Sequence, residues 1–377
     1  MDREISPPPI KRRKLGQSVP VDPTHLPPSM VPTPASPNTM RIFSWNINGI
    51  TPFLQKSITS FFPKSSGPNS KNDSVPRASL RSFLHRHHWP SILLIQEVKI
   101  AHKDARTQDA VRTAINPSTT STDNGPTYDA HFTLPNDPFN ARGPRGSGKV
   151  YGVCSILRRS LSQRYTVNVR TVDWDAEGRV SVVELTNGEE KLAIFNIYAV
   201  NGTDNPYRDP TTGRVCGTRH DRKRAFHALL ASECKRLEEQ GWEVLLGGDM
   251  NVAPDARDGW PKLRTFPQAH VLNRSDFREK FLSGMGDGKE QKAAGFNGMD
   301  VWREMHRDER RYTYYSRGRE WGTSCDRVDY FVTGRGAWER GLIKHCGILN
   351  SEAERGPSDH VPIWVDVAHP STEKERS

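Results

Sequence analysis

Val244-Leu245-Leu246-Gly247-Gly248-Asp249 is the stretch of sequence that decides the fold. A short apolar run that ends on a carboxylate predicts a buried strand with a polar group at its exit. The same pattern occurs earlier in the chain, where Ile92-Leu93-Leu94-Ile95 leads into Gln96-Glu97. Because ligands bind beyond the carboxyl ends of buried strands, we expect Asp249 and Glu97 to meet at one edge of the sheets.

Further strands and helices surround these two runs. The sequence predicts strands near 40–45, 149–158, 164–172, 179–186, 191–200, 328–332 and 363–367, and helices near 79–87, 219–240 and 275–283. In the segment 219–240, Phe226, Leu230 and Cys234 recur at helical spacing. Many strands with fewer, separated helices indicate an α/β chain in which sheets pack on each other with helices outside.

The composition divides the chain into three parts. Residues 1–39 are rich in Pro, Ser and Thr and poor in large apolar residues, which predicts a disordered tail. Residues 40–368 carry the strands and helices, and we interpret them as one domain. Residues 369–377 are charged and are expected to fray.

Charge and composition exclude several classes of protein. Lys and Arg number 54 against 44 Asp and Glu, which gives a formal charge of +10 and favours a polyanionic partner. No apolar run approaches the roughly 18 residues of a membrane span, and no secretory signal is expected. The five cysteines form no C-x-x-C pair, which indicates neither a zinc site nor a disulfide framework and favours a reducing compartment.

A basic cluster, Lys11-Arg12-Arg13-Lys14, lies within the N-terminal tail. A short basic run in a proline-rich segment is typical of a nuclear import signal or of a nucleic-acid contact, whereas the plainer interpretation is a solvated charge run. We expect a nuclear protein.

Polar residues follow the apolar strands at six places. Each has an ordinary explanation when taken alone, as a turn residue, a surface pair or a tyrosine at the edge of the core. Together they predict one site at the rim of the sheets. The residues are Asn46 and Asn48, Glu97, Tyr198 and Asn201, Asp249 and Asn251, Asp329, and Asp359 with His360.

The order of these motifs resembles the endonuclease/exonuclease/phosphatase superfamily, and within it the exonuclease III-type abasic-site endonucleases. The resemblance covers about residues 40–368. It implies a four-layer α/β sandwich of the DNase I type, with two mixed β-sheets packed face to face and helices outside. The motifs are Ser44-Trp45-Asn46-Ile47-Asn48-Gly49, Leu94-Ile95-Gln96-Glu97-Val98-Lys99, Asn196-Ile197-Tyr198-Ala199-Val200-Asn201, Gly248-Asp249-Met250-Asn251-Val252, Arg327-Val328-Asp329-Tyr330 and Ser358-Asp359-His360-Val361-Pro362.

The resemblance also implies a role for each residue of the site. A Mg²⁺ ion, for which Mn²⁺ is expected to substitute, would be held by Glu97 with Asp359 and Asn48 nearby, since Mg²⁺ prefers oxygen ligands. Asp249 would orient or deprotonate the attacking water, oriented itself by Asn46. His360 would donate to the phosphate, kept protonated by Asp329. Asn251 would hold a phosphate oxygen or the water, Tyr198 would assist the phosphate or the leaving group, and Asn201 would contact phosphate.

Substrate-binding residues are expected beside this centre. Arg145 and Lys149 belong to a basic, glycine-rich segment, 142–149, suited to DNA phosphates, although it also reads as a solvated loop. In the family's abasic enzymes the sugar pocket is built from an aromatic residue, a Trp and a Leu. Here those positions are Tyr314, Asp326 and Val328, and Asn48 stands where many members have Asp.

Three functions remain open on the sequence. The first is a Mg²⁺-dependent DNA phosphodiesterase of base-excision repair, which cuts 5′ to abasic sites or removes 3′ blocking groups and nucleotides from damaged or nicked duplex DNA. The second is a less selective nuclease, or a phosphodiesterase of DNA ends or RNA. The third is a nucleic-acid-binding module with a weak catalytic site, against which the full set of polar residues argues. We expect a monomer that binds no membrane.

Overall fold

A computed structural model of the 377-residue chain describes residues 31–33, 38–54, 78–117, 123–141, 150–282 and 295–369. Within these ranges, elements of secondary structure extend from Thr39 to Ala368. The basic cluster 11–14 and the segment 142–149 lie outside the described residues.

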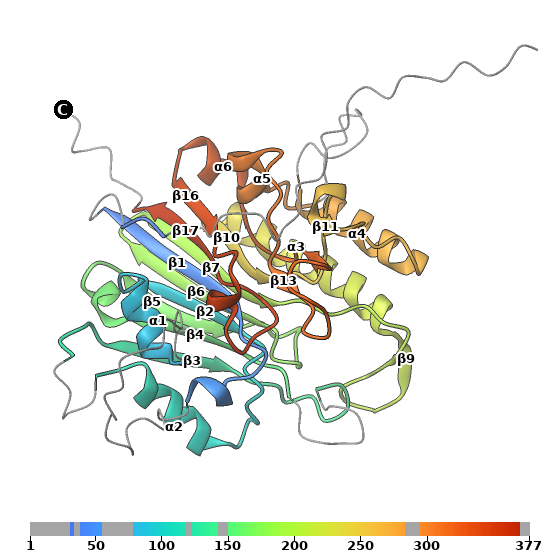
Figure 1. Ribbon diagram of the computed structural model, residues 1–377, viewed down its shortest axis with the longest axis horizontal. Coiled ribbons are helices and arrows are strands. Elements are labelled where there is room, and N and C mark those ends of the chain that lie inside the picture. The colour runs from blue at the N-terminus through green and yellow to red at the C-terminus, as the bar shows by residue number, and fades with distance from the viewer. Residues whose placement is uncertain are drawn as a thin grey trace, which may run out of the picture.

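The first sheet has six strands in the order β16-β17-β1-β2-β4-β3. Strand β1 pairs in parallel with β2 and antiparallel with β17, so that the first and last strands lie side by side in the middle of the sheet (Figure 1). The strands are β1 (Thr39–Asn46), β2 (Ile92–Gln96), β3 (Tyr128–Thr133), β4 (Val153–Arg158), β16 (Ile343–Ile348) and β17 (Ile363–Ala368).

The second sheet also has six strands, in the order β12-β15-β10-β7-β6-β5. Its members are β5 (Thr166–Thr171), β6 (Val180–Asn187), β7 (Glu190–Tyr198), β10 (Glu243–Asp249), β12 (Met299–Asp300) and β15 (Asp329–Thr333). Two small sheets lie beside it. One joins β11 (Gly259–Trp260), β14 (Cys325–Asp326) and β13 (Tyr314–Tyr315), and the other is the hairpin of β8 (Pro206–Arg208) and β9 (Val215–Thr218).

Helices cover the outer faces of both sheets. Residues of α1 (Leu80–Arg86) and α2 (Ala105–Ala114) share an apolar cluster with the first sheet, whereas α3 (Arg219–Glu239) and α4 (Gln268–Phe281) share one with the second (Figure 1). The shorter helices are α5 (Val301–His306), α6 (Arg335–Glu339) and α7 (Glu352–Arg355), with 3₁₀ turns at Thr51–Phe53, Arg159–Gln163 and Ala256–Asp258. The predicted four-layer sandwich is confirmed.

Alternation along the strands decides which side chains enter the space between the sheets. In β1, Met40 and Ile42 pack in the cluster between the sheets, whereas Phe43 and Trp45 pack against α1. In β10, Leu245 points inward. Because the period of a strand is two residues, the last residue of each strand, Asn46 and Asp249, also faces inward. The apolar pattern that builds the core therefore aims these polar side chains at each other.

Several elements differ from the sequence prediction. Helix α4 begins at Gln268, seven positions before the expected 275, and α2 was not predicted, because its only buried residue is Val111 and it lacks an apolar stripe. The edge strand β3 is half exposed and gives a similarly weak signal.

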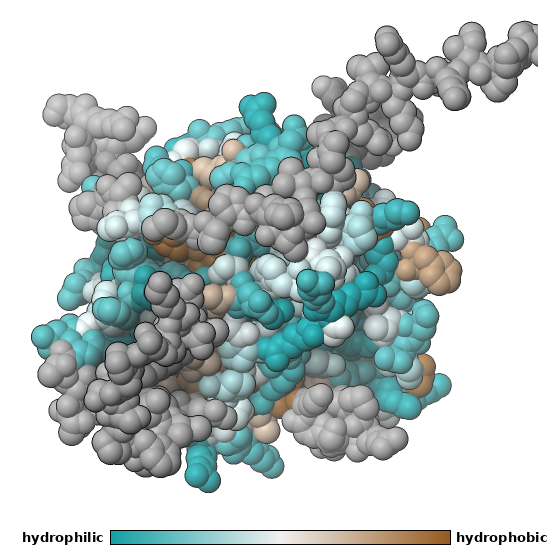
Figure 2. Space-filling model, viewed as in Figure 1, coloured by the Kyte–Doolittle hydropathy of each residue, from teal (hydrophilic) through white to brown (hydrophobic). Residues whose placement is uncertain are grey.

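A few residues just outside 40–368 also contact the domain. Val31 packs against the core and the Pro32 carbonyl accepts from Arg41, whereas His369 donates its backbone N–H to the Asn38 carbonyl. The face shown in Figure 2 is mostly hydrophilic, in line with the mean hydropathy of −0.72. Across the described ranges, each helix is too short or too polar to cross a bilayer.

Candidate active site

The site forms where strands of both sheets end at the same edge. In the first sheet Asn46 pairs with Gln96, one residue before Glu97, and in the second Asp249 pairs with Tyr198 on one side and Asp329 on the other. The Asn46 amide donates to Asp249 Oδ2 across the gap between the sheets, at 3.0 Å. Residues that are 203 positions apart in the chain therefore meet at this edge.

Asp249 lies at the centre of the site and is almost fully buried. Its Oδ2 accepts from Asn46, and its Oδ1 accepts from the backbone N–H of Asn251 at 2.8 Å. The preceding residue must be glycine, because a Cβ at Gly248, whose φ is +146°, would lie 1.9 Å from the Ile197 carbonyl oxygen. The carboxylate is thus held in one orientation by fixed donors.

His360 faces Asp249 and is oriented from behind by Asp329. Its Nδ1 lies 2.7 Å from Asp329 Oδ2, and its Nε2 lies 4.0 Å from Asp249 Oδ2. The backbone around it is held by Ser358, whose hydroxyl donates to the Asn46 carbonyl and accepts from the His360 N–H. The ring therefore presents Nε2 to the pocket.

Burial and neighbouring charges separate the pKa values of these groups. Burial, together with the charge of Asp329, raises the pKa of Asp249 to about 7, although His360 opposes this shift. Burial alone would lower the pKa of His360, but the carboxylate of Asp329, its hydrogen bond, and the charges of Asp249 and Asp359 outweigh it and raise that pKa to about 10. At neutral pH the imidazole is therefore a cation.

A second group of oxygen atoms lies beside this pair. Asn48 Nδ2 donates to Asp359 Oδ1 at 3.0 Å, and the Lys99 ammonium lies 3.0 Å from Glu97 Oε1 and against Asn48 Oδ1. Glu97, Asn48 and Asp359 offer only oxygen atoms as metal ligands. Two of these side chains, Glu97 and Asn48, already contact the cationic Lys99. They fit a hard divalent cation such as Mg²⁺.

Asp249, Asp329 and His360 also offer ligand atoms that lie within 4.8 Å of one another. A protonated imidazole cannot bind a metal, since both ring nitrogens carry hydrogen. The hydrogen bond between His360 and Asp329 fits a proton-bearing network, and Glu97, Asn48 and Asp359 are the residues that could hold a cation.

The backbone is strained where the site residues leave their strands. Asn48, Glu97 and Asn251 have φ values of +52°, +55° and +52°. Asparagine tolerates this left-handed conformation, but for a residue such as Glu97 it costs about 1–2 kcal/mol. Strain of this kind is found where the surrounding structure fixes a side chain for function.

Tyr198 is the last residue of β7 and Asn201 follows three residues later, and both line the same pocket. The Tyr198 ring is buried against the Arg179 guanidinium, 4.9 Å from the ring centroid, and burial raises the pKa of its hydroxyl well above the usual range. Asn201 is exposed at the rim.

The pocket has a volume of about 330 Å³ and gathers most of the predicted site. Asn48 and Asp329 contact its walls from behind, through Asp359 and His360 respectively. Arg145 and Lys149 lie outside the residues that the structure describes. The predicted residues that line the pocket are Asn46, Glu97, Tyr198, Asn201, Asp249, Asn251, Tyr314, Asp359 and His360.

Helices α3 and α4 supply lining residues that sequence reasoning missed. Lys223 is buried and donates to the Asn251 carbonyl at 2.7 Å, and burial lowers its pKa to about 7. Asn273 is also buried, and its Oδ1 has no partner among the described residues. The helical spacing of the sequence could have shown that both residues are buried. Lys223 lies on the same helix face as Phe226 and Leu230, and Asn273 lies on the same face as Phe277 and Phe281.

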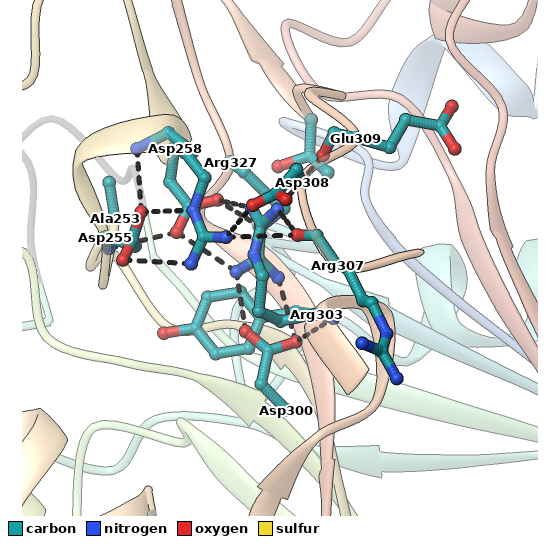
Figure 3. A network of polar contacts seen from close by, with 12 residues as sticks. Ala253, Asp255, Asp258, Asp300, Arg303, Arg307, Asp308, Glu309 and Arg327 are labelled. Carbon is teal, nitrogen blue, oxygen red and sulfur yellow. Dashed lines mark hydrogen bonds and ion pairs between the residues drawn. The ribbon is translucent and has the colours of Figure 1, made fainter. Parts of the chain in front are cut away.

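A buried ion network fixes the strands behind the pocket (Figure 3). Arg327 is fully buried and its guanidinium lies 2.7 Å from Asp258 Oδ1 and 2.6 Å from Asp300 Oδ2. Arg303 also contacts Asp258. Since Arg327 stands two residues before Asp329 and directly after Asp326, the network holds both ends of this segment.

A family model of the endonuclease/exonuclease/phosphatase family matches residues 43–360. The chain belongs to this family. The predicted family is thereby confirmed, and it comprises metal-dependent phosphodiesterases and nucleases. No curated protein matches the chain in a search by sequence.

Solved structures share the fold of this family member at low sequence identity. The AP endonuclease LMAP from Leishmania major has a TM-score of 0.62 at 18% identity, over 94% of this chain and 96% of its own. The Xenopus laevis APE2 catalytic domain has a TM-score of 0.54 at 19% identity, over 88% and 94%. The 3′ phosphatase NExo from Neisseria, bound to a product DNA hairpin, has a TM-score of 0.51 at 16% identity, over 87% and 99%.

Proposed function

We propose that this protein hydrolyses phosphodiester bonds in DNA and that it requires a divalent cation, which we expect to be Mg²⁺. One observation carries the proposal. A buried carboxylate, Asp249, faces a protonated imidazole, His360, in a pocket that also holds the oxygen cluster of Glu97 and Asp359. Such a site combines a proton acceptor, a cationic hydrogen-bond donor and oxygen ligands for a metal, which is what phosphodiester hydrolysis requires.

Each residue then has a chemical task. The Asp249 carboxylate takes a proton from a water molecule, whose oxygen forms a bond to phosphorus. The bond from phosphorus to the 3′ oxygen of the preceding nucleotide breaks, and that oxygen takes a proton from a water molecule, which leaves a 3′-hydroxyl and a 5′-phosphate. His360 Nε2 donates to a non-bridging oxygen of the phosphate. A divalent cation at Glu97, Asn48 and Asp359 would neutralise charge on the phosphate.

Two further side chains assist the phosphate. Because burial raises the pKa of Tyr198, its hydroxyl stays protonated and donates to the phosphate or to the leaving oxygen. The side-chain amide of Asn251, which donates to the Ala199 carbonyl and to Asp249 Oδ2, would hold the water or a phosphate oxygen. Asn201 at the rim contacts a neighbouring phosphate.

The substrate we propose is damaged or nicked duplex DNA, with incision 5′ to abasic sites or removal of 3′ blocking groups and nucleotides. The motif order supports an exonuclease III-type enzyme, and the charge of +10 supports a polyanionic partner. Structures with this fold include AP endonucleases and a 3′ phosphatase. We further propose that the protein acts as a monomer in the nucleus, directed there by the cluster Lys11–Lys14.

One labelled duplex in three forms tests the substrate: with an abasic-site analogue, with a 3′-phosphate at a nick, and intact. Each is incubated with the purified protein in Mg²⁺ and in EDTA. We expect Mg²⁺-dependent incision at the abasic position or release of the 3′-phosphate, with the intact duplex cut far more slowly. Equal cleavage of all three would establish the less selective nuclease, and no cleavage of any would refute the proposal.

A further inference from the structure

We propose that the part of the pocket beside His360 binds the base of a nucleotide, and that Asp326 reads this base by accepting hydrogen bonds from its amino group. The inference deepens the proposed function and rests on it, because it names the nucleotide beside the cleaved phosphate. The substrates would then include DNA with an unpaired, base-bearing nucleotide at this position.

The register of the small sheet places Asp326 toward the site. Tyr314 pairs with Asp326 on β14 and, on its other side, forms a bridge with His360. Directly paired residues of neighbouring strands project from the same face, so that Asp326, Tyr314 and His360 form one row that points into the pocket. Two strand spacings separate Asp326 from His360, about 10 Å. A ligand that places its phosphate at His360 thus has Tyr314 next to it and Asp326 one step further.

Asp326 is poised to receive hydrogen bonds. Its carboxylate is half-buried and accepts none from the described residues, and burial raises its pKa. Arg264 and Arg274 lie near enough to offset this shift in part, but neither forms an ion pair with it within the described chain. The carboxylate lines the pocket, so a ligand there that supplies N–H donors can form hydrogen bonds with it.

The surroundings fit a nucleobase. Tyr314 offers a half-buried aromatic ring, on which a base can stack, and Leu263 and Val328 offer apolar contacts. Arg274 is fixed by hydrogen bonds to the carbonyls of Ala253 and Arg264. The Arg264 side chain is exposed at the rim, where a guanidinium can contact a phosphate. Of the pyrimidines, cytosine carries the amino donor that a carboxylate accepts from.

The first test measures binding, in EDTA, of two labelled duplexes that differ at one unpaired nucleotide opposite thymine. The nucleotide is deoxycytidine or deoxyuridine, which have the same sugar and exchange an amino group for a carbonyl. We expect the wild type to bind the cytosine duplex about tenfold more tightly, the size of one good side-chain contact to a base edge. The variant Asp326→Asn, whose amide both donates and accepts, should reduce this ratio to about one. Asp173→Asn, a matched change at an exposed site away from the pocket, should leave the ratio intact.

Equal binding of the two duplexes by the wild type, or an unchanged ratio in Asp326→Asn, would overturn the inference. Thermal unfolding of both variants shows whether they are folded. Cleavage of the same duplexes in Mg²⁺ is then measured separately. A cytosine preference in binding without any cleavage would support base recognition while refuting the proposed phosphodiesterase, whereas cleavage without the preference would do the reverse.

Discussion

At the scale of single residues, two buried groups with pKa values driven apart can work together at neutral pH. Asp249 must be a carboxylate to accept a proton, and His360 must be a cation to donate. With pKa values of about 7 and about 10, both conditions hold only in the window between them. Because the two groups titrate as a pair, the two limits of this pH window belong to the pair rather than to either residue alone.

The pH profile of kcat/KM should therefore be bell-shaped. Below a limb at or near pH 7 the rate should fall tenfold per unit as Asp249 gains its proton, and above about pH 10 it should fall as His360 loses its own. Asp329→Asn removes the carboxylate that raises the pKa of His360, so the alkaline limb should move toward neutral pH. An alkaline limb that stays in place in this variant would contradict the assigned role of Asp329.

Glu97→Gln should raise the Mg²⁺ concentration for half-maximal cleavage by at least about tenfold, since changes to the shells around a metal cost 10–100-fold in affinity. The amide keeps an oxygen ligand but loses the charge. A Mg²⁺ titration of the rate measures the effect, with Glu189→Gln on the exposed β6–β7 turn as the matched control. Identical titrations for Glu97→Gln and the wild type would place the cation elsewhere.

Site residues could be predicted from the sequence where a polar side chain follows an apolar strand, as at Asn46, Glu97 and Asp249. The sequence analysis did not place Lys223 and Asn273 in the pocket. Their helical spacing shows only that they lie on a buried face, and the packing of α3 and α4 decides that this face lines the pocket.

At the scale of elements, the segment from β14 to β15 depends on Arg327. Its guanidinium satisfies both Asp258 and Asp300 away from water (Figure 3). Removing one partner of a buried ion pair leaves uncompensated charge, which is far more costly than losing an exposed pair.

Arg327→Leu should lower the free energy of unfolding by about 3–5 kcal/mol. Arg112→Leu, which breaks the exposed Arg112–Asp109 pair of α2, should change it by less than about 1 kcal/mol. Urea denaturation of both variants makes the comparison. Similar small losses at the two sites would show that the network does not hold this segment.

Helices and strands could be predicted from the sequence where a segment is buried along its whole length, as for β2 and β10, or along one face, as for α3. The polar helix α2 and the half-exposed strand β3 escaped prediction, because only tertiary contacts stabilise them.

At the scale of the whole molecule, stacking two sheets joins strand ends that are far apart in the chain. The contact between Asn46 and Asp249 spans 203 positions, and that between Trp45 Nε1 and the His360 carbonyl spans 315. The site therefore exists only when the complete sandwich has formed.

The N-terminal tail should direct the protein to the nucleus and should not contribute to catalysis. Deletion of residues 1–30 keeps Val31 and Pro32, which contact the domain, and should leave cleavage unchanged while the protein disperses from nuclei. Alanine substitution of Lys11–Lys14 in the full chain should disperse it equally. Fluorescence microscopy of tagged proteins measures both, and nuclear retention of either variant would refute the import signal.

The most direct test of the central claim compares DNA cleavage and DNA binding by Asp249→Asn and the wild type. The wild type should cleave a damaged duplex only with a divalent cation. The variant should lose about 10²–10⁴-fold in single-turnover rate, as expected for a lost acid–base group, while its Kd for the same duplex changes less than about threefold. A variant that cleaves at the wild-type rate would show that this pocket is not where the phosphodiester bond is broken.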